Sequence, residues 1–182
     1  MPRIGPLDHP VGKAEELLGQ VRTTLGFVPD LMRVLAHSPA ALAGYLSLRD
    51  KLSTDRLPLR LREQIAVAVA ATTGCDVCLA SHTRYGREAG LADDEIEAAR
   101  RVTSADPASA AALGFARILL DARGHVSDAD IAAVRAGGFD DPAIIEITAT
   151  VAFNLFANLI NNLAHEATAA VPAEARDRSS AR

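Results

Sequence analysis

The thiol chemistry available to this chain is concentrated in one short stretch, EQIAVAVAATTGCDVCLASH, residues 63–82. The only two cysteines are Cys75 and Cys78, and His82 follows four residues after the second. At about 3.6 residues per turn, the three side chains share one face of a helix. A C-x-x-C pair can close into a disulfide, and a histidine one turn away can accept or relay a proton. The spacing therefore indicates thiol–disulfide chemistry.

Two further residues are needed to position these groups. Gly74 breaks the preceding helix, so Cys75 is expected at the N-terminus of the next one, where free N–H groups and the helix dipole favour a thiolate. Glu63 lies 11 residues before Gly74 and His82 lies 8 after it. At about 1.5 Å per residue, a hairpin brings this carboxylate and imidazole to similar heights. Such a chain of groups suits attack of a thiolate on a peroxide, followed by closure of a disulfide.

The hydrophobic periodicity and the capping signals predict helices over nearly the whole chain, and no alternating strand pattern is present, so the fold class is all-α. The second half of the helix that begins at Leu59 is almost entirely apolar, which predicts burial on all sides. The expected helices are Val11–Leu25, Leu31–Ala36, Ala40–Leu52, Leu59–Ala71, Cys75–Ala89, Asp93–Arg101, Ala108–Ala122, Ile131–Ala136 and a long one from Asp141-Pro142 towards Ala169.

The cysteine motif has an echo 83 residues further along the chain. Glu146 and His165 repeat the spacing of Glu63 and His82, and Asn158 and Asn161 stand where the cysteines were. We interpret this as an internal repeat of a helical hairpin in which one copy kept the thiols. Together with Asn154, the two asparagines and His165 form a polar stripe on an apolar helix. If buried, this stripe must find hydrogen-bond partners, and it is expected to fix the packing or to form a wall of the site.

Composition limits the class of protein. The chain has 182 residues, 49% of them hydrophobic, and a net charge of −4, which predicts a single domain with a sizeable core. No basic block suggests nucleic acid, and no apolar run approaches the roughly 20 residues of a membrane span. The N-terminal MPRIGPLDHP lacks the apolar core of a signal peptide. We therefore expect a soluble cytoplasmic protein without a nucleic-acid or membrane partner.

Other interpretations of the motif remain open at this point. A zinc site would need four ligands, and this chain offers one C-x-x-C and one nearby histidine. A thioredoxin-like enzyme would need strands around its cysteines. Both cysteines could instead be small core residues, and Glu63 could be a surface acid paired with Arg60 or Arg62. Tyr85 lies near the same helix face and is expected either in the core or lining a pocket.

The pattern E-x11-C-x2-C-x3-H, met by Glu63, Cys75, Cys78 and His82, resembles that of the AhpD-like alkylhydroperoxidases of the carboxymuconolactone decarboxylase superfamily. The preceding LGFVPDLMRVLAHSPAALAGY is similar to the N-terminal helices of the peroxidase-related members. The resemblance spans roughly residues 25–170. It implies an all-α fold of repeated helical units, assembled as homo-oligomeric trimers or hexamers, and a reaction that needs no metal or other cofactor.

The resemblance also implies roles. Cys78 would attack the hydroperoxide, Cys75 would close the disulfide, and Glu63 and His82 would relay protons. A dithiol reductant, a lipoyl or thioredoxin-type protein, would restore the thiols. Some relatives carry a histidine between the cysteines. This chain has Asp76 and Val77 there, and an acid beside Cys75 opposes its ionisation.

These observations predict an N-terminal helical extension (residues 1–24), an AhpD-like domain (25–170) and a disordered tail (171–182). The leading hypothesis is a thiol-dependent alkylhydroperoxide reductase with an antioxidant role. The first alternative is a decarboxylase-like acid–base enzyme in which Glu63 and His82 act without the thiols. The second is a redox-sensing helical oligomer without catalytic activity.

Overall fold

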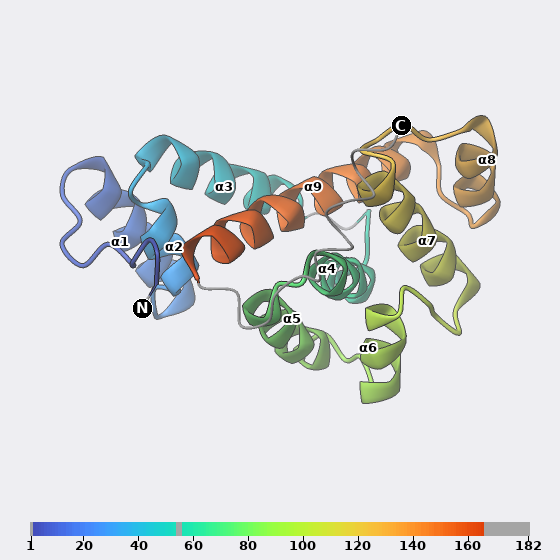
Figure 1. Cartoon of the computed structure of the whole chain (residues 1–182), viewed down its shortest axis with the longest axis horizontal. Helices are drawn as coiled ribbons and strands as arrows, with labels where there is room; N and C mark the ends of the chain where they lie inside the picture. Colours follow the sequence, from blue (N-terminus) through green and yellow to red (C-terminus); the bar gives the residue numbers. More distant parts are fainter. Residues whose placement is uncertain (1, 54–55, 166–182) are drawn as a thin grey trace.

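The computed structural model describes residues 2–53 and 56–165, and these fold into nine α-helices with no strand (Figure 1). The all-α prediction is therefore confirmed. In chain order the helices are α1 (Lys13–Leu25), α2 (Asp30–Leu35), α3 (Pro39–Lys51), α4 (Leu59–Thr73), α5 (Asp76–Glu88), α6 (Asp93–Arg100), α7 (Pro107–Asp121), α8 (Asp128–Ala136) and α9 (Asp141–Ala164).

Every predicted helix is present, and the differences lie at the ends. The helix expected from Ile131 begins earlier, at Asp128, because the Ser127 side chain accepts a hydrogen bond from the Asp130 N–H and caps it. The last helix ends at Ala164 rather than near Ala169, since His165 already has an extended backbone conformation. The predicted tail, residues 171–182, falls outside the described residues, and the domain boundaries stay predictions.

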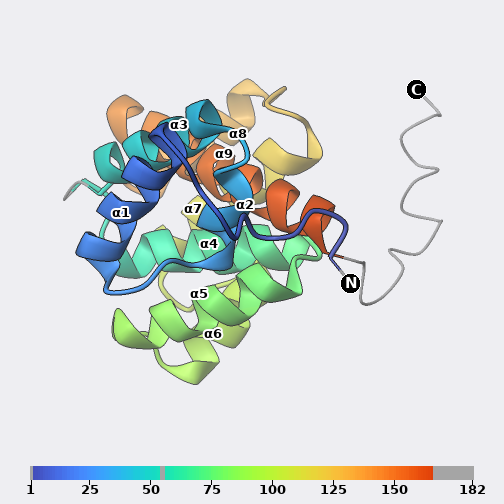
Figure 2. The same ribbon diagram turned by 90° about the vertical axis from the view of Figure 1, so that its left-hand side faces the viewer.

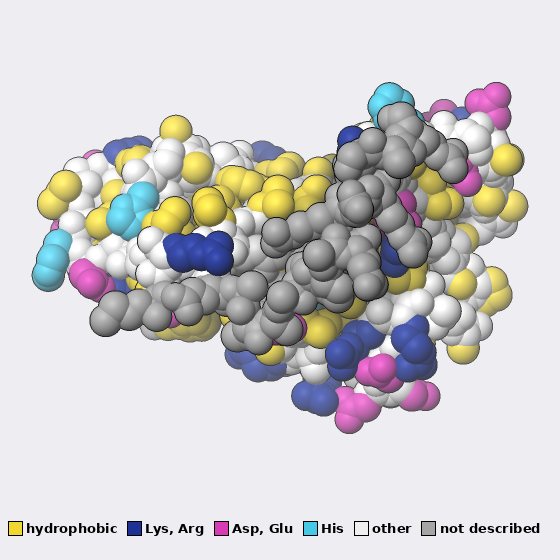
Figure 3. Space-filling view, in the orientation of Figure 1, with side chains coloured by type: hydrophobic (Ala, Val, Ile, Leu, Met, Phe, Trp, Pro, Cys, Tyr) yellow, Lys and Arg dark blue, Asp and Glu magenta, His cyan; other side chains and the backbone are white. Residues whose placement is uncertain are grey.

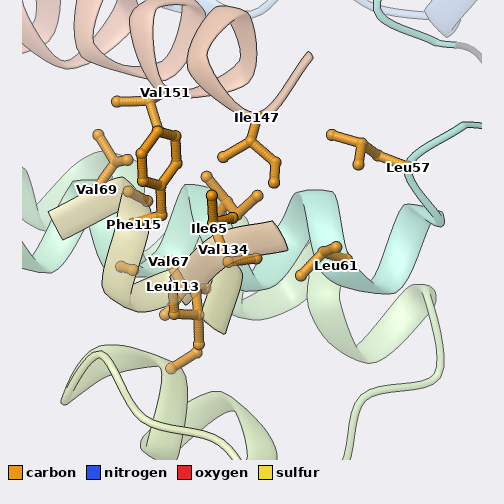
Figure 4. Packing of buried hydrophobic residues seen from close by; sticks show 14 of the residues in the cluster. Leu57, Leu61, Ile65, Val67, Val69, Leu113, Phe115, Val134, Ile147 and Val151 are labelled. Carbon is orange, nitrogen blue, oxygen red and sulfur yellow. The ribbon is translucent and has the colours of Figure 1, made fainter. Parts of the chain in front are cut away.

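The main hydrophobic core surrounds α4. Its residues Ile65–Ala70 are all buried, as the apolar second half of this helix predicted. Figure 4 shows side chains of α4 packed against Phe115 of α7, Val134 of α8, and Ile147 and Val151 of α9. A helix covered on all sides by apolar neighbours is held rigidly, since interiors pack at crystal-like density. The hairpin that carries the cysteines thus starts from a helix whose second half is buried in the core.

A second hydrophobic cluster lies at the N-terminal end of the molecule. It joins α1, α2 and α3, where Leu17, Met32 and Leu42 are buried, to Ala157 of α9. Phe153 of α9 also stacks on Tyr45 of α3, with ring centroids 4.7 Å apart. Figure 2 shows α1, α2 and α3 gathered at this end, with α9 running behind them. The long helix α9 therefore belongs to both clusters and ties the two parts of the fold together.

The second copy of the predicted repeat does not form a hairpin. Helix α9 runs unbroken through Ala157, which stands 83 residues after Gly74, because alanine favours helix where the glycine ends one. Glu146 and His165 therefore lie 19 residues apart along one axis, about 28 Å at about 1.5 Å per residue. Glu146 contacts Arg56 instead, with Oε1 and Nε 3.7 Å apart. Glu146 and His165 thus repeat the sequence spacing of Glu63 and His82, but they do not face each other across a hairpin and form no second site.

Helix α9 also departs from the expectation that no apolar run is long enough to span a membrane. Of the helices in the described residues, it alone is long and apolar enough by length and composition, with 24 residues and an 18-residue stretch of mean hydropathy 1.7. In this fold it packs against α4 and α7, and it buries Asn154, Asn158 and Asn161 against protein. Those contacts are typical of the central helix of a bundle.

The surface carries charges of both signs. Figure 3 shows Lys and Arg intermingled with Asp and Glu over α6, and a band of hydrophobic side chains along α3 and α9. Leu48, Leu159 and Leu163 are among the large apolar residues exposed on these two helices.

Candidate active site

The site is built on a very tight turn between α4 and α5, which lie side by side in Figures 1 and 2. Gly74 ends α4 in the left-handed conformation, with φ +65°, which glycine adopts without the steric cost of a Cβ. The Cys75 N–H then donates to the Ala70 carbonyl, 3.0 Å away, and α5 begins at Asp76. The predicted glycine-broken hairpin is confirmed.

The two sulfurs are covalently linked. Cys75 is the N-cap of α5, and its Sγ accepts a hydrogen bond from the Cys78 N–H at 3.3 Å. Cys75 and Cys78 form a disulfide, with Cα atoms 5.2 Å apart. Both residues are almost fully buried, and only Cys78 lines the pocket described below. The structure thus gives the two sulfurs unequal positions, one at the pocket wall and one behind it.

The predicted carboxylate–imidazole contact is present. Glu63 of α4 and His82 of α5 meet through Oε2 and Nδ1 at 2.8 Å, and both side chains are largely shielded from water. The surface-acid alternative for Glu63 is therefore wrong, and Arg60 pairs with Glu95 instead. When Nδ1–H donates to the carboxylate, Nε2 of a neutral ring is the acceptor that remains. His82 lies one turn after Cys78, which sets side chains roughly 5–6 Å apart at Cβ.

The asparagine stripe of α9 faces this hairpin and closes the site. Asn161 donates its Nδ2 hydrogen to Cys78 Sγ at 3.3 Å, and Asn158 donates to Thr73 Oγ1 at 2.9 Å. Asn154 donates to the Thr150 carbonyl within its own helix. The expectation of a satisfied polar wall is confirmed for these amide nitrogens. The specific contact from Asn161 to a sulfur was not predicted, because it joins residues 83 positions apart.

These groups converge on one pocket of about 700 Å³ between the hairpin, α3 and α9. It is lined by Glu63, Cys78 and His82, and by Tyr85, which the sequence placed near the same face. The Tyr85 ring stands edge-on to His82, with centroids 5.9 Å apart. All the predicted site residues except Cys75 therefore reach one cavity, and Cys75 reaches it through its bond to Cys78.

Sequence analysis missed several polar residues of this pocket, among them Tyr45, Arg49 and Arg62. Burial raises the pKa of Tyr45 to about 12, against the opposite influence of the Arg49 guanidinium, so the phenol is neutral. No local motif marks these residues, since α3 reaches the hairpin only through tertiary packing. Within the described residues, no group of three or more His, Cys, Asp or Glu is arranged to hold a metal ion.

Fold and site together define an all-α protein with a disulfide-linked C-x-x-C beside a carboxylate–imidazole pair. Residues 39–121, which include all four predicted site residues, match the carboxymuconolactone decarboxylase family. A solved structure described as the AhpD core of an uncharacterised peroxidase-related protein from Ralstonia eutropha JMP134 superposes with a TM-score of 0.75 at 26% identity, covering 88% of this chain and 90% of that one. The matched segment and the fold are thus similar to those of the AhpD-like carboxymuconolactone decarboxylase superfamily.

Two curated relatives are similar to part of the chain. The alkyl hydroperoxide reductase Rv2159c of Mycobacterium tuberculosis is 31% identical over 83 residues, which are 45% of this chain and 24% of that protein. The alkyl hydroperoxide reductase AhpD of Gluconacetobacter diazotrophicus is 34% identical over 86 residues, 47% of this chain and 45% of that protein. The match thus spans less than half the length of either relative.

Proposed function

We propose that this protein is a thiol-dependent hydroperoxide reductase with an antioxidant role. The observation that carries the proposal is the arrangement of the two sulfurs: Cys78 lines a pocket shared with the Glu63–His82 pair, and Cys75 lies behind it within bonding distance. The names of the two curated relatives, both alkyl hydroperoxide reductases, support the same chemistry.

In the proposed reaction, His82 Nε2 accepts the proton of the Cys78 thiol, and Glu63 stabilises the imidazolium that results. The thiolate attacks the terminal oxygen of ROOH, so that an S–O bond forms as the O–O bond breaks. The alkoxide leaves and takes a proton from the imidazolium to become ROH. Cys78 is now a sulfenic acid.

The second half of the reaction closes the disulfide. The Cys75 sulfur attacks Cys78 Sγ, the S–S bond forms, and the S–O bond breaks to release water. The sum is ROOH plus two thiols giving ROH, water and the disulfide present in this structure. The helix N-terminus at Cys75 favours the thiolate needed for this attack, against the opposing charge of Asp76. A dithiol protein, lipoyl or thioredoxin-type, then reduces the pair by exchange.

The experiment starts from protein with both thiols reduced. One equivalent of an organic hydroperoxide is added, free thiols are trapped, and the mass of the protein is measured. We expect two thiols to be lost as one intramolecular bond, with turnover once a dithiol is supplied. Cys78→Ser should abolish peroxide consumption, and Cys75→Ser should leave a sulfenic acid that a dimedone probe traps. Consumption of hydroperoxide by Cys78→Ser at the wild-type rate would overturn the assignment of the attacking sulfur.

A matched pair of variants tests the proton relay. His82→Gln should slow the reaction by about 10²-fold or more, the usual contribution of general acid–base catalysis, and His125→Gln on the exposed surface should leave the rate unchanged. The alternative of a decarboxylase-like acid–base enzyme, which the Glu63–His82 contact within the pocket also favours, is tested by combining His82→Gln with a double cysteine variant. That enzyme would need His82 and would keep its activity in the Cys75→Ser, Cys78→Ser double variant.

A further inference from the structure

The pocket at Cys78 is far larger than a small peroxide needs. Its volume of about 700 Å³ compares with a share of about 30 Å³ for one water molecule in the liquid. Sites for organic ligands generally measure about 300–1,000 Å³ and are mostly apolar with a few polar groups. The apolar part of this lining includes Met32, Leu59, Ala66, Val77, Phe153 and Ala157. Volume and lining therefore favour a bulky, largely apolar substrate.

One end of this pocket carries two arginines. Arg49 lies in the last turn of α3, and Arg62 lies in α4, one residue before Glu63. Arg62 Nη1 donates to the Leu52 carbonyl at 2.8 Å, and Leu52 follows Arg49 by three residues. This hydrogen bond places the Arg62 guanidinium where the end of α3 meets the beginning of α4, and Arg49, which also lines the pocket, lies in the last turn of α3. We call this pair of residues, Arg49 and Arg62, the arginine end of the pocket.

The arginine end has no anionic partner among the described residues. Arg62 Nε is buried and has no hydrogen-bond partner, although a guanidinium offers five N–H donors. The carboxylates that line the pocket are already engaged, Glu63 by His82 and Asp30 by Arg33. Partly buried cations are costly unless paired, so two of them beside an apolar cavity are suited to an anion that arrives with the ligand.

The separation between the arginine end and the sulfur limits the shape of that ligand. The turn at Gly74 sets Cys78, four residues after it, near the level of Ala70, four residues before it, and these two residues share one buried cluster. The Arg62 backbone therefore lies eight residues from the level of Cys78 along α4, roughly 12 Å at about 1.5 Å per residue. The ligand must therefore be elongated, with its anion at the end opposite to the group that meets the sulfur.

We propose that the substrate is an elongated, largely apolar organic hydroperoxide that carries a carboxylate or a similar anion at the end opposite to its peroxide group. Arg49 and Arg62 bind the anion, the apolar walls bind the body of the molecule, and Cys78 meets the terminal peroxide oxygen. The proposal rests on the proposed function. The anion takes no part in the bond changes, so ROOH still gives ROH and water at the expense of the two thiols.

The test uses two probes that differ only in charge: cumene hydroperoxide with a para carboxylate, and the same molecule with a para carboxamide. We expect the wild-type kcat/KM to favour the carboxylate by about tenfold, the factor that one charge-assisted hydrogen bond supplies. Arg49→Gln and Arg62→Gln should each reduce this preference, because each should lower kcat/KM for the carboxylate more than kcat/KM for the carboxamide. Lys51→Gln removes a positive charge two residues from Arg49, from a residue that does not line the pocket, and should keep the full preference.

A binding measurement keeps this test separate from the redox proposal. The alcohol products of the two probes are titrated calorimetrically into the disulfide form, which needs no turnover. Tighter binding of the carboxylate, reduced in Arg49→Gln and partly kept in Arg62→Lys, supports the anion site even if neither peroxide is consumed. Equal affinities for the two alcohols would overturn it, and so would an unchanged preference in both glutamine variants. In those cases the arginines serve only the end of α3, whose carbonyls attract positive charge.

Discussion

The contact between Asn161 and Cys78 leads to a quantitative prediction for the variant Asn161→Leu. The amide of Asn161 is buried and donates to Cys78 Sγ at 3.3 Å. Leucine has the same number of heavy atoms and the same branch point at Cγ but no donor, so the substitution removes the hydrogen bond and keeps the shape of the side chain approximately. A disulfide sulfur is a weak acceptor, whereas a thiolate is a charged one. Removing the hydrogen bond therefore destabilises the reduced, ionised form more than the disulfide form.

The size of the effect follows from the difference between those two acceptors. A hydrogen bond to a charged group contributes about 1.5–3 kcal/mol, and one between neutral groups about 0.5–1.5. The reduced form of the variant is therefore less stable relative to the disulfide by about 1–1.5 kcal/mol when Cys78 is ionised. For a two-electron couple this makes the reduction potential more negative by about 20–30 mV.

The rate of attack should change less than the potential. If the thiolate loses about 1–1.5 kcal/mol of stabilisation, its population falls by about five- to tenfold at a pH where the thiol is mostly protonated. The remaining thiolate is more basic and more nucleophilic, with a Brønsted coefficient of about 0.4–0.5, which recovers close to half of the loss on a logarithmic scale. We therefore expect about a threefold slower reaction with hydroperoxide near neutral pH.

The assay is a glutathione redox titration from pH ~6 to ~10, a range that brackets the ordinary cysteine pKa of about 8.5. The shift in potential should grow with pH as the thiolate forms, which a merely structural effect of the substitution would not produce. Asn162→Leu is the control, because this exposed neighbour donates to the Thr73 carbonyl instead. A potential that is unchanged, or equally shifted at every pH, would refute the argument.

Three further predictions concern the relay, the turn and the helix caps. Glu63→Gln removes the carboxylate that orients the imidazole, and peroxide turnover should fall by about 10- to 100-fold with little change in melting temperature. Gly74→Ala forces a Cβ into φ +65° and should lower the free energy of unfolding in urea by about 1 kcal/mol, whereas Gly44→Ala within α3 should raise it by about 0.5–1 kcal/mol. The Ser109 N–H donates to Asp106 and holds the pKa of that carboxyl below its usual value, so the stabilisation is present above about pH 4 and is lost as pH falls below it. Thermal melts on acidification should therefore show a larger loss for the wild type than for Asp106→Asn.

Much of the site follows from local rules, and the sequence was sufficient to predict it. A glycine that ends one helix and a cysteine that caps the next fix the turn within a few residues. The height at which Glu63 meets His82 then depends only on the rise per residue of two antiparallel helices. The disulfide spacing is equally local. Each of these features depends on short-range geometry, and each is present in the structure.

The repeated spacing from Glu146 to His165 shows that spacing alone does not determine which residues meet. The spacing from Glu146 to His165 equals that from Glu63 to His82, but a spacing acquires a three-dimensional meaning only through the break between its ends. With alanine at 157 instead of glycine, the helix continues and the two residues separate. The same continuity lets α9 pass along the hairpin and bring Asn161 to Cys78.

The sequence by itself determined the helices, the turn and the four groups proposed to carry out the chemistry, because these depend on residues within one or two helical turns. Only the tertiary structure decided what surrounds them: the amide against the sulfur, the arginines at one end of the pocket, and the cavity itself. The physical reason is that the contacts between α3, α4 and α9 result from the summed burial of many apolar side chains. No single residue or short motif predicts which faces of α3, α4 and α9 pack together.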